Sequence, residues 1–427
     1  MASAYVPDVV RKVDGISYLA PMPQKALFIS LDGITDPLGQ SQVLPYLVGL
    51  SAKGFAISIA SCEKPVNYEK NRAVVEAICA NAGINWQYCF YEQKIPLVSQ
   101  RKNFTKLKNL AHSLVKNGNI PLVQCRSYLP ALIGLHLNKK YNTRFIFDMR
   151  GFWADERIDG NIWKLSNPVH RFMYRYFKKQ EKRLLSEADY VVTLTENAKT
   201  EIESWQLNRL PPMKVIPCCA DVNHFTISTA AEKQAVRVNL QIDKDAFVLG
   251  YLGSVGTWYM TDEMLDFFVE LKKIKPNALL FFVTADDKAL IIQAAAQKGI
   301  AEKDILIKPA KRNEVPQFIS VFNVGLFFIK PLFSKKGSSP TKLAEMLACG
   351  IPVISNRGIG DCDTIITQYN CGVVIDDFSP AAYKAAIQHI DAFIAMPPQH
   401  FRDVALNNFS LEKGVEAYET IYQSLLI

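Results

Sequence analysis

The chain has 427 residues, whereas a typical domain has about 100–200, so the length predicts two domains. Hydrophobic residues make up 49% and charged residues 21% of the chain, a composition that excludes intrinsic disorder, collagen and coiled coil. The net charge of +8 is uneven: residues 1–211 hold 28 Lys+Arg and 18 Asp+Glu (+10), and the remainder holds 21 and 23 (−2). A basic first half predicts an anionic partner: nucleic acid, a phosphorylated substrate or an anionic membrane.

Short apolar runs rich in β-branched and aromatic residues alternate with longer amphipathic segments. The predicted strands of the first half cover 25–31, 56–61, 121–125, 144–149, 190–194 and 214–217, and its predicted helices cover 42–53, 68–82, 102–117 and 170–186. After a Pro-rich stretch the pattern restarts, with strands at 247–253, 278–285, 305–310, 324–330, 351–356 and 372–376.

This alternation predicts an α/β protein with two Rossmann-like, doubly wound parallel-sheet domains that face each other across a cleft. We expect an N-terminal domain over residues 1–220 and a C-terminal domain over residues 221–400. The last segment, 401–427, is a predicted helix that the sequence allows to pack on either domain, including back on the first.

The cysteines and the N-terminal segment indicate the cellular compartment of the protein. The nine Cys include the adjacent Cys218 and Cys219, and their spacing, without any CxxC, is neither a disulfide framework nor a zinc pattern. We interpret them as reduced thiols. Residues 1–24 contain no apolar run that would predict a signal peptide or an anchor helix, so a cytoplasmic location is expected.

The stretch 335–356, KKGSSPTKLAEMLACGIPVISN, gives the strongest indication of a binding site. Pro340 before a run of good helix formers predicts a helix start, whose free N–H groups and dipole attract anions. Lys342 adds a positive charge in the first turn, and Glu345 follows one turn later on the same side. The pattern fits a diphosphate at the turn with a ribose at the carboxylate. The alternative is a capped core helix whose Lys and Glu are solvated.

The run from Ser339 to Ile354 resembles the donor-binding signature of glycosyltransferase family 4, the group 1 glycosyltransferases, which have the GT-B fold. The likeness continues in the glycine loop at 249–259, the interdomain crossing at 214–225, and the segments 188–202 and 36–54. The last of these is similar to the first loop and helix of bacterial surface-polysaccharide transferases. The resemblance implies a retaining, metal-independent, hexosyltransferase-type enzyme that uses a nucleotide diphosphate sugar and no cofactor.

Carried over residue by residue, the resemblance implies that Glu345 binds the donor ribose and that the diphosphate is held by Ser339, Pro340, Thr341 and Lys342. The phosphate side of the cleft would be lined by Gly253, Ser254, Gly256 and Thr257. Gly39 and Gln40 would approach the transferred sugar, and Lys311 and Arg312 the base. For the glycines the alternative is a role in shaping a turn, and for the last pair a solvated loop.

Two departures from the family pattern concern charge. The family commonly has a second Glu eight residues before Glu345, where this chain has Gly337, which leaves the seating of the sugar open. The Arg and Lys that commonly follow the glycine loop are also absent from this chain. Compensating positive charge is expected from Lys342, Lys330, Arg126 and Arg150, and we select Lys342, Arg150 and Arg126 as candidate catalytic residues.

The segment 147–163 of the first domain follows a predicted strand and mixes charged residues with aromatic ones. Carbohydrate hydroxyls bind charged partners, and sugar ring faces lie on aromatic rings. We therefore predict Asp148, Arg150, Trp153 and Glu156 on the acceptor side of the cleft. The alternative is a structural salt-bridge loop.

Residues 167–185 form a predicted basic amphipathic helix with interleaved aromatics. Peripheral contact with an anionic membrane and packing on the sheet with a solvated basic face are both consistent with this pattern. Nucleic acid is not expected, because no known binding motif accompanies the charge.

Asp361-Cys362-Asp363 imitates a DxD metal motif, but no metal site is expected there, since GT-B enzymes of this kind do not resemble metal-dependent ones.

The combined expectation is a retaining glycosyltransferase that moves a sugar from a nucleotide diphosphate donor to a glycan or lipid-linked saccharide in cell-surface polysaccharide synthesis, peripheral at the inner membrane face. Two alternatives stay open. One is a nucleotide-sugar epimerase of GT-B fold, and the other is a non-catalytic scaffold of a polysaccharide assembly complex with a degenerate donor site. The base, sugar, linkage, acceptor and oligomeric state are not encoded in any motif that we recognise.

Overall fold

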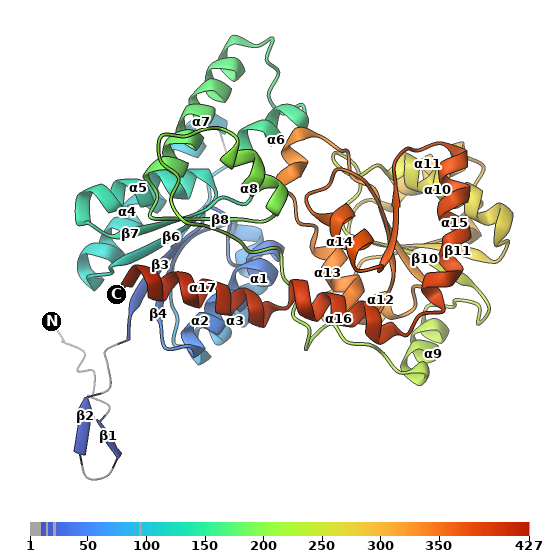
Figure 1. The fold of residues 1–427 in the computed structure, drawn as a ribbon, viewed down its shortest axis with the longest axis horizontal. Coiled ribbons are helices and arrows are strands. Elements are labelled where there is room, and N and C mark those ends of the chain that lie inside the picture. Colours follow the sequence, from blue (N-terminus) through green and yellow to red (C-terminus); the bar gives the residue numbers. More distant parts are fainter. Residues whose placement is uncertain (1–9, 14–15, 20–22, 94–95, 427) are drawn as a thin grey trace.

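The computed structural model describes residues 10–13, 16–19, 23–93 and 96–426 (Figure 1). Strands β1 (Val10–Val13) and β2 (Ile16–Leu19) pair antiparallel, apart from the two main sheets. The sequence predicts no signal peptide or anchor helix over residues 1–24, and most of these residues lie outside the described ranges. None of the helices in the described ranges combines the length and the apolar character that crossing a bilayer requires.

The first domain is built on a parallel 7-stranded sheet with the order β5-β4-β3-β6-β7-β8-β9. Its strands are β3 (Lys25–Ile29), β4 (Ala56–Glu63), β5 (Asn85–Phe90), β6 (Leu122–Arg126), β7 (Arg144–Asp148), β8 (Tyr190–Thr193) and β9 (Met213–Val215). Its helices are α1 (Pro37–Gln42), α2 (Leu44–Ala52), α3 (Pro65–Asn81), α4 (Pro96–Gly118), α5 (Tyr128–Tyr141), α6 (Trp153–Asp159), α7 (Pro168–Glu187) and α8 (Glu196–Glu203).

The second domain has a parallel 6-stranded sheet with the order β12-β11-β10-β13-β14-β15. Its strands are β10 (Phe247–Leu252), β11 (Ala278–Val283), β12 (Ile305–Lys308), β13 (Val324–Phe327), β14 (Val353–Asn356) and β15 (Gly372–Ile375). Its helices are α9 (Ala230–Asn239), α10 (Thr261–Ile274), α11 (Lys288–Gln297), α12 (Val315–Ser320), α13 (Thr341–Ala348), α14 (Cys362–Gln368) and α15 (Pro380–Ile394), with the 3₁₀ turns η1 (Glu302–Asp304) and η2 (Phe333–Gly337). Two parallel-sheet α/β domains side by side confirm the predicted two-domain Rossmann-like architecture (Figure 1).

Two elements of the first domain differ from the sequence prediction. Strand β5 was not predicted, because it lies at the edge of the sheet and its alternating polar residues are largely unburied. The predicted helix over 42–53 is instead the end of α1 followed by α2, with the break at Val43. Pro45 lies in the first turn of α2 and has no N–H to continue the hydrogen bonding of α1.

The chain crosses between the domains twice, at neighbouring points. The backbone N–H of Ala220 donates to Phe409 O (2.8 Å), and Leu411 N–H donates back to Ala220 O (3.1 Å). The segment 401–427 is therefore not one helix: α16 (Pro398–Phe409) packs on α13, and α17 (Leu411–Leu426) packs on α2 of the first domain. In Figure 1 the two helices run almost end to end from one domain to the other.

Arg402 of α16 fixes this crossing to the second domain. Its guanidinium donates to three carbonyl oxygens, those of Phe225 (2.7 Å), Ala348 (2.8 Å) and Val222 (2.8 Å). These bonds join the end of α13 to the crossing segment, and their loss leaves three carbonyl groups without a donor.

Arg402→Ala is therefore expected to lower the free energy of unfolding by about 2–3 kcal/mol, because the hydrogen bonds are charge-assisted. Urea denaturation followed by fluorescence measures this change. Arg357→Ala is the matched control, since Arg357 forms its ion pairs with Asp376 and Asp363 at the surface and its side chain is 60% exposed. Equal effects of the two substitutions would contradict a structural role for Arg402.

Candidate functional site

A cavity of about 320 Å³ lies between the two domains. The first domain contributes residues from α1, the ends of β6 and β7, α6 and the crossing segment, and the second contributes the loop before α13 together with the loop after β10. The lining residues are Leu38, Gln42, Arg126, Arg150, Glu156, Leu194, Cys218, Trp258, Tyr259, Ile329, Lys335, Gly337, Ser338, Ser339, Pro340 and Thr341. The cavity thus lies beyond the carboxyl ends of strands from both sheets, where α/β proteins bind ligands.

The N-terminus of α13 opens into this cavity. Pro340 takes the N-cap position with extended backbone (φ −66°, ψ 120°), and its carbonyl accepts the N–H of Leu343 (3.2 Å). The first amides of a helix have no intrahelical partner, and the helix dipole makes this end positive. The Ser339 hydroxyl accepts the N–H of Cys218 from the crossing segment (3.1 Å), which fixes the turn against the first domain. The predicted anion-binding turn therefore faces a cavity, not protein.

Lys342 is buried behind that turn, with 5% of its surface exposed. Its Nζ donates to the Tyr251 hydroxyl (3.2 Å) and lies 4.3 Å and 3.9 Å from the ring centroids of Tyr251 and Tyr259. Within the described residues it forms no ion pair. Burial lowers the pKa of Lys342 to about 7, although Glu345 pulls it upward. A buried ammonium without an ion-pair partner is costly, and the lowered pKa reflects that cost.

Gly253 closes the other side of this lysine. The backbone of Gly253 has φ +114°, and a Cβ there would lie 3.1 Å from Lys342 Nζ. A side chain at this position would be strained and would also crowd the amine. The glycine loop after β10 is therefore shaped around Lys342. Gly256 and Thr257 continue the loop in the left-handed region, at φ +76° and +46°.

Glu345 lies one turn after Lys342 on α13 and is partly buried. Burial raises the pKa of Glu345 to about 7, and the positive charges of Arg312 and Lys342 oppose this rise. Because Arg312 acts on the pKa of Glu345, the loop after β12 lies near this carboxylate. A desolvated carboxylate with unused acceptor capacity is suited to accept hydrogen bonds from ligand hydroxyl groups.

Arg126 and Arg150 approach the cavity from the first domain. Arg150 has left-handed backbone (φ +59°), its Nη1 lies 3.6 Å from Asp148 Oδ1, and its Nη2 contacts Cys218 Sγ (3.4 Å). Burial opposes the charge of Arg150, but Asp148 raises its pKa above the ordinary value. Arg126 is 8% exposed, and burial and then the charge of Arg150 lower its pKa. The negative charges of Asp148 and Asp32 oppose this lowering, so two carboxylates lie near the two guanidinium groups.

Asp148 lies beneath these arginines and not in the cavity itself. Its Oδ2 accepts from Gln124 Nε2 (3.2 Å) and from the Tyr418 hydroxyl of α17 (3.0 Å), and its side chain is almost fully buried. The predicted acceptor-side carboxylate is therefore placed to orient Arg150. The C-terminal helix takes part in that arrangement through Tyr418.

The position of the missing family carboxylate has a steric explanation. A Cβ on Gly337 would lie 2.9 Å from the Cα of Gly151 in the first domain, so the two glycines meet backbone to backbone. Around this contact, Lys335 Nζ pairs with Glu156 (3.0 Å) and Ser334 N–H donates to Asp159 Oδ2 (2.9 Å). A Glu at 337 would require the domains to separate in this region.

Asp361 joins the same interface. Its carboxylate accepts the N–H groups of Glu196 (2.7 Å) and Asn197 (3.0 Å) at the start of α8 in the first domain. Among the residues in the described ranges, no group of three or more His, Cys, Asp or Glu side chains is arranged to hold a metal ion. Asp361 therefore has an interdomain capping role in this structure.

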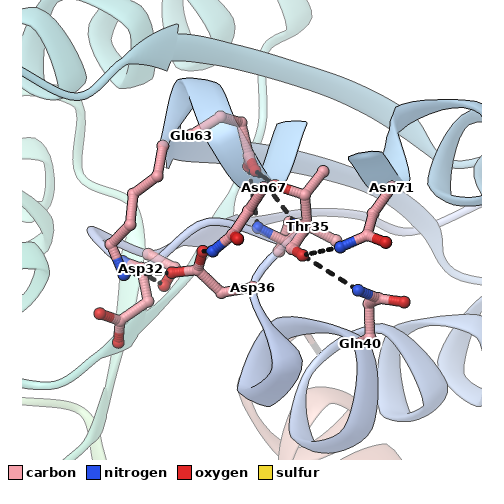
Figure 2. A network of polar contacts seen from close by, with 10 residues as sticks. Asp32, Thr35, Asp36, Gln40, Glu63, Asn67 and Asn71 are labelled. Carbon is pink, nitrogen blue, oxygen red and sulfur yellow. Dashed lines mark hydrogen bonds and ion pairs between the residues drawn. The ribbon is translucent and has the colours of Figure 1, made fainter. Parts of the chain in front are cut away.

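A polar network holds the loop between β3 and α1, which leads to Gly39 and Gln40 (Figure 2). The buried Glu63 carboxylate accepts the N–H groups of Ile34 (2.8 Å) and Thr35 (3.1 Å), the Thr35 hydroxyl (2.5 Å) and the Ser61 hydroxyl (2.5 Å). Gln40 Nε2 and Asn71 Nδ2 both donate to Thr35 O (3.0 and 2.9 Å). The side chain of Gln40 is thus used within the loop, and its neighbours Leu38 and Gln42 line the cavity.

Two family descriptions match the chain, one on each domain. Glycosyltransferase Family 4 matches residues 44–224, and Glycosyl transferases group 1 matches residues 232–391. The chain belongs to the family 4 and group 1 glycosyltransferases. The order and extent of the two matches follow the two sheets described above.

Among curated proteins, this chain is similar to the teichuronic acid biosynthesis glycosyltransferase TuaH of Bacillus subtilis, with 24% identity over 220 residues, 50% of each chain. It is also similar to the D-inositol 3-phosphate glycosyltransferase of Stackebrandtia nassauensis, with 26% identity over 207 residues, 46% of this chain and 44% of that protein. The chain spans about half the length of the curated relatives it matches.

Solved structures share the fold over nearly the whole chain. Sucrose-phosphate synthase from Thermosynechococcus elongatus has a TM-score of 0.71 at 15% identity, covering 94% of this chain and 99% of that one. Anabaena HepE, solved in complex with UDP and glucose, has a TM-score of 0.67 at 13% identity, covering 94% and 100%. At these identities the likeness shows the GT-B fold of the glycosyltransferase.

Several predicted residues do not line the cavity, and Lys342, Glu345 and Gly253 are among them. Trp153 points to the far side of α6, where its ring packs on Trp163 and Phe177 with centroids 5.4 and 4.8 Å away. Lys311 and Arg312 are exposed in the loop after β12, and the Arg312 carbonyl contacts His224 Nε2 (3.0 Å). The Ser254 carbonyl accepts the Tyr251 hydroxyl. The placement of these side chains relative to the cavity follows from the tertiary structure and not from the sequence pattern.

Sequence inspection missed Glu63, Tyr251, Tyr259 and the pairing of Lys335 with Glu156. Glu63 ends β4 two residues beyond the predicted strand 56–61, with no motif around it, and its partners Ile34 and Thr35 lie 29 and 28 residues away in the chain. Tyr251 and Tyr259 are within the glycine-loop match, so the aromatic residues that flank the glycines are a signal that could have been used.

Glu63→Gln is expected to lower the free energy of unfolding by about 1.5–3 kcal/mol, because a neutral amide replaces a carboxylate that accepts four hydrogen bonds. The transfer rate of the folded variant should also fall, since the loop that carries Leu38 and Gln42 loses its support. Urea denaturation and steady-state kinetics measure the two effects. Glu76→Gln on the exposed face of α3 is the control and should change stability little. Wild-type values for Glu63→Gln would remove Glu63 from any positioning role.

Proposed function

We propose that this protein is a retaining glycosyltransferase that moves a sugar from a nucleotide diphosphate sugar to a hydroxyl of a glycan or lipid-linked saccharide in cell-surface polysaccharide synthesis. The observation that carries the proposal is the N-terminus of α13, which opens into an interdomain cavity opposite Arg126 and Arg150. The UDP and glucose of the HepE complex and the teichuronic acid role in the name of TuaH support the donor and the pathway class. The expected location is the cytoplasmic side of the membrane.

In this proposal the diphosphate lies at the α13 tip. The free amides near Ser339–Thr341, the helix dipole and Lys342 stabilise the charge that develops as the sugar–phosphate bond breaks. Glu345 accepts hydrogen bonds from the ribose hydroxyls. Arg126 and Arg150 add positive charge from the opposite wall, so the diphosphate is a better leaving group when the domains are together.

Transfer with retention is proposed to occur on one face of the sugar. The bond from the anomeric carbon to the phosphate oxygen breaks, the bond to the acceptor oxygen forms, and the acceptor proton passes to the departing phosphate. Among the residues that line the cavity, the acidic side chain is Glu156, and it is paired with Lys335. A paired carboxylate is a poor nucleophile, which favours this route over a covalent sugar–enzyme intermediate.

We also propose that the reaction needs no metal ion. Lys342, Arg126 and Arg150 supply the positive charge that a divalent cation would otherwise bring to a diphosphate. This proposal predicts full activity after treatment with EDTA. Restoration of lost activity by Mg²⁺ or Mn²⁺ would contradict it.

The test of function uses the full chain, a panel of nucleotide sugars that includes UDP-glucose, and NMR of the products. Glycosidic product with the donor's anomeric configuration, or slow donor hydrolysis without acceptor, supports the proposal. Conversion of the donor to its epimer without acceptor would establish the epimerase alternative instead. Absence of saturable nucleotide binding would favour the scaffold.

Glu345→Ala should weaken nucleotide binding by about 2 kcal/mol, or roughly 30-fold, because hydrogen bonds to a charged acceptor are lost. Isothermal titration with UDP measures the change. Glu314→Ala is the control, since Glu314 lies in the same domain and its carboxylate bonds only to the backbone N–H of Lys311 among the residues described. Unchanged UDP affinity in Glu345→Ala would exclude Glu345 from the donor site.

Nucleotide affinity should also depend on the protonation of Lys342. Its pKa is about 7 in the free protein, and a bound diphosphate favours the charged form and raises that pKa. UDP affinity should therefore fall by up to about tenfold per pH unit above 7, since binding then requires proton uptake. Titrations between pH 7 and pH 9 measure this slope. Lys342→Met should bind more weakly at pH 7 and show a flat profile, whereas a flat wild-type profile would contradict the assignment.

A further inference from the structure

A second cavity lies on the first domain, away from the interdomain site. Its volume is about 670 Å³, and it is bounded by α4, α5, α6 and α7. Its lining is mostly aliphatic and aromatic: Phe104, Leu129, Leu132, Trp153, Ile162, Trp163, Val169, Met173, Tyr176 and Phe177, with Gln100, Arg101, Arg157 and His170. We call this cavity the α7 groove. Nothing in the proposed transfer step uses it.

Apolar side chains also project from α7 and the preceding loop into solvent. Ile162 is 49% exposed, Val169 55%, Phe172 70% and Tyr176 42%. Val169, Phe172 and Tyr176 are three and four residues apart, so they form one stripe along the helix beside the groove. Exposed apolar surface that continues into an apolar cavity usually marks an interaction site.

Positive charge surrounds this apolar surface. Residues 160–180 contain Lys164, Arg171, Arg175, Lys178 and Lys179 and no Asp or Glu. Of these, Lys178 alone forms an ion pair within the described part of the chain, with Asp155 and Glu181. Arg175 follows Phe172 by three positions and Lys179 follows Tyr176 by three, so cations border the apolar stripe.

The groove itself carries two further cations. Arg101 of α4 and Arg157 of α6 line it, and neither forms an ion pair with another described residue. The Arg157 guanidinium lies 4.8 Å from the Trp153 ring centroid. Apolar surface framed by unpaired cations complements a partner that is apolar inside and anionic outside, which describes a membrane of anionic lipids.

We propose that α7 docks on an anionic lipid bilayer and that the α7 groove receives a hydrocarbon chain of a bilayer lipid. Phe172, Tyr176 and Val169 enter the boundary between headgroups and chains, and Arg171, Arg175 and Lys179 contact anionic headgroups. In Figure 1, α7 projects from the sheet on the side of the first domain opposite α17, so the helix is accessible.

The position of α6 connects this surface to the interdomain cavity. Trp153 and Arg157 of this short helix line the α7 groove, and Glu156 of the same helix lines the interdomain cavity. The two cavities therefore share one short helix of the first domain. Docking itself does not depend on the proposed sugar transfer, so the two proposals can fail separately.

Vesicle binding by the full chain tests the docking. The protein should cosediment with vesicles of phosphatidylcholine and phosphatidylglycerol, bind pure phosphatidylcholine far more weakly, and dissociate as salt is raised. The triple variant Arg171→Gln, Arg175→Gln, Lys179→Gln should bind about a hundredfold more weakly. Phe172→Ser should bind at least about tenfold more weakly. Val238→Ser is the matched control, since Val238 is 66% exposed on α9 of the other domain.

Absence of binding to anionic vesicles, or equal binding of the Phe172 and Val238 variants, would overturn the docking. Loss of self-association in Phe172→Ser, seen by analytical ultracentrifugation of a wild-type oligomer, would instead make this face a contact between copies of the chain and would also overturn it. UDP affinity should be the same in wild type and Phe172→Ser, which separates this result from any failure of the donor site.

Lipids brominated along their chains test the groove. Bromine quenches nearby tryptophan fluorescence, and Trp153 and Trp163 line the groove, whereas Trp86, Trp205 and Trp258 do not. Quenching should occur in wild type and disappear in the variant Trp153→Phe, Trp163→Phe, provided that both bind the vesicles. Vesicle binding without quenching, or equal quenching in the two proteins, would overturn entry of a chain into the groove.

Discussion

Buried positive charge is the feature around which the interdomain site is organised. Lys342 lies between two tyrosine rings with no carboxylate in ion-pair contact among the described residues, and Arg126 and Arg150 share Asp148. Desolvated cations raise the free energy of the folded protein unless a partner offsets that cost. In the proposed function, the diphosphate of the donor is such a partner.

The positive charge at this site comes from both domains. The α13 tip and Lys342 belong to one domain, and the two arginines belong to the other. Contacts of η2 with α6 and of Asp361 with α8 hold the domains at this distance, and Gly151 and Gly337 let the backbones touch. The chain passes between the domains at the paired crossing of Ala220 and Ser410. In this arrangement Arg126 and Arg150 of the first domain and the α13 tip of the second line one cavity.

Helix α6 divides the first domain's functional surface into two environments. On one side Glu156 and Lys335 form a polar boundary of the cavity, and on the other side aromatic rings form an apolar groove. Successive residues of a helix point about 100° apart, so adjacent residues can line different surfaces. In α6, Glu156 lines the interdomain cavity and Arg157 lines the α7 groove. The polar interdomain cavity and the apolar α7 groove are thus lined by different residues of one helix.

Much of the fold could be predicted because its signals are local. Buried parallel strands are continuous apolar runs, and most of them lie where the runs predict them. Strand β5 was missed since an edge strand has one unburied side, and the break at Val43 was missed since one proline decides it. Such errors come from short segments whose environment, not their composition, selects the structure.

By itself the sequence determined the two α/β units, the start of α13 at Pro340, and the spacing that puts Lys342 and Glu345 on neighbouring turns, because helix dipoles, proline and periodicity act within a few residues. Tertiary structure alone decided that Arg126 faces that helix, that Glu63 supports the loop before Gly39, that Trp153 turns away from the cavity, and that Gly337 meets Gly151. These placements depend on strand order and on domain contact between residues far apart in the chain, and no local pattern encodes which distant partner a side chain will meet.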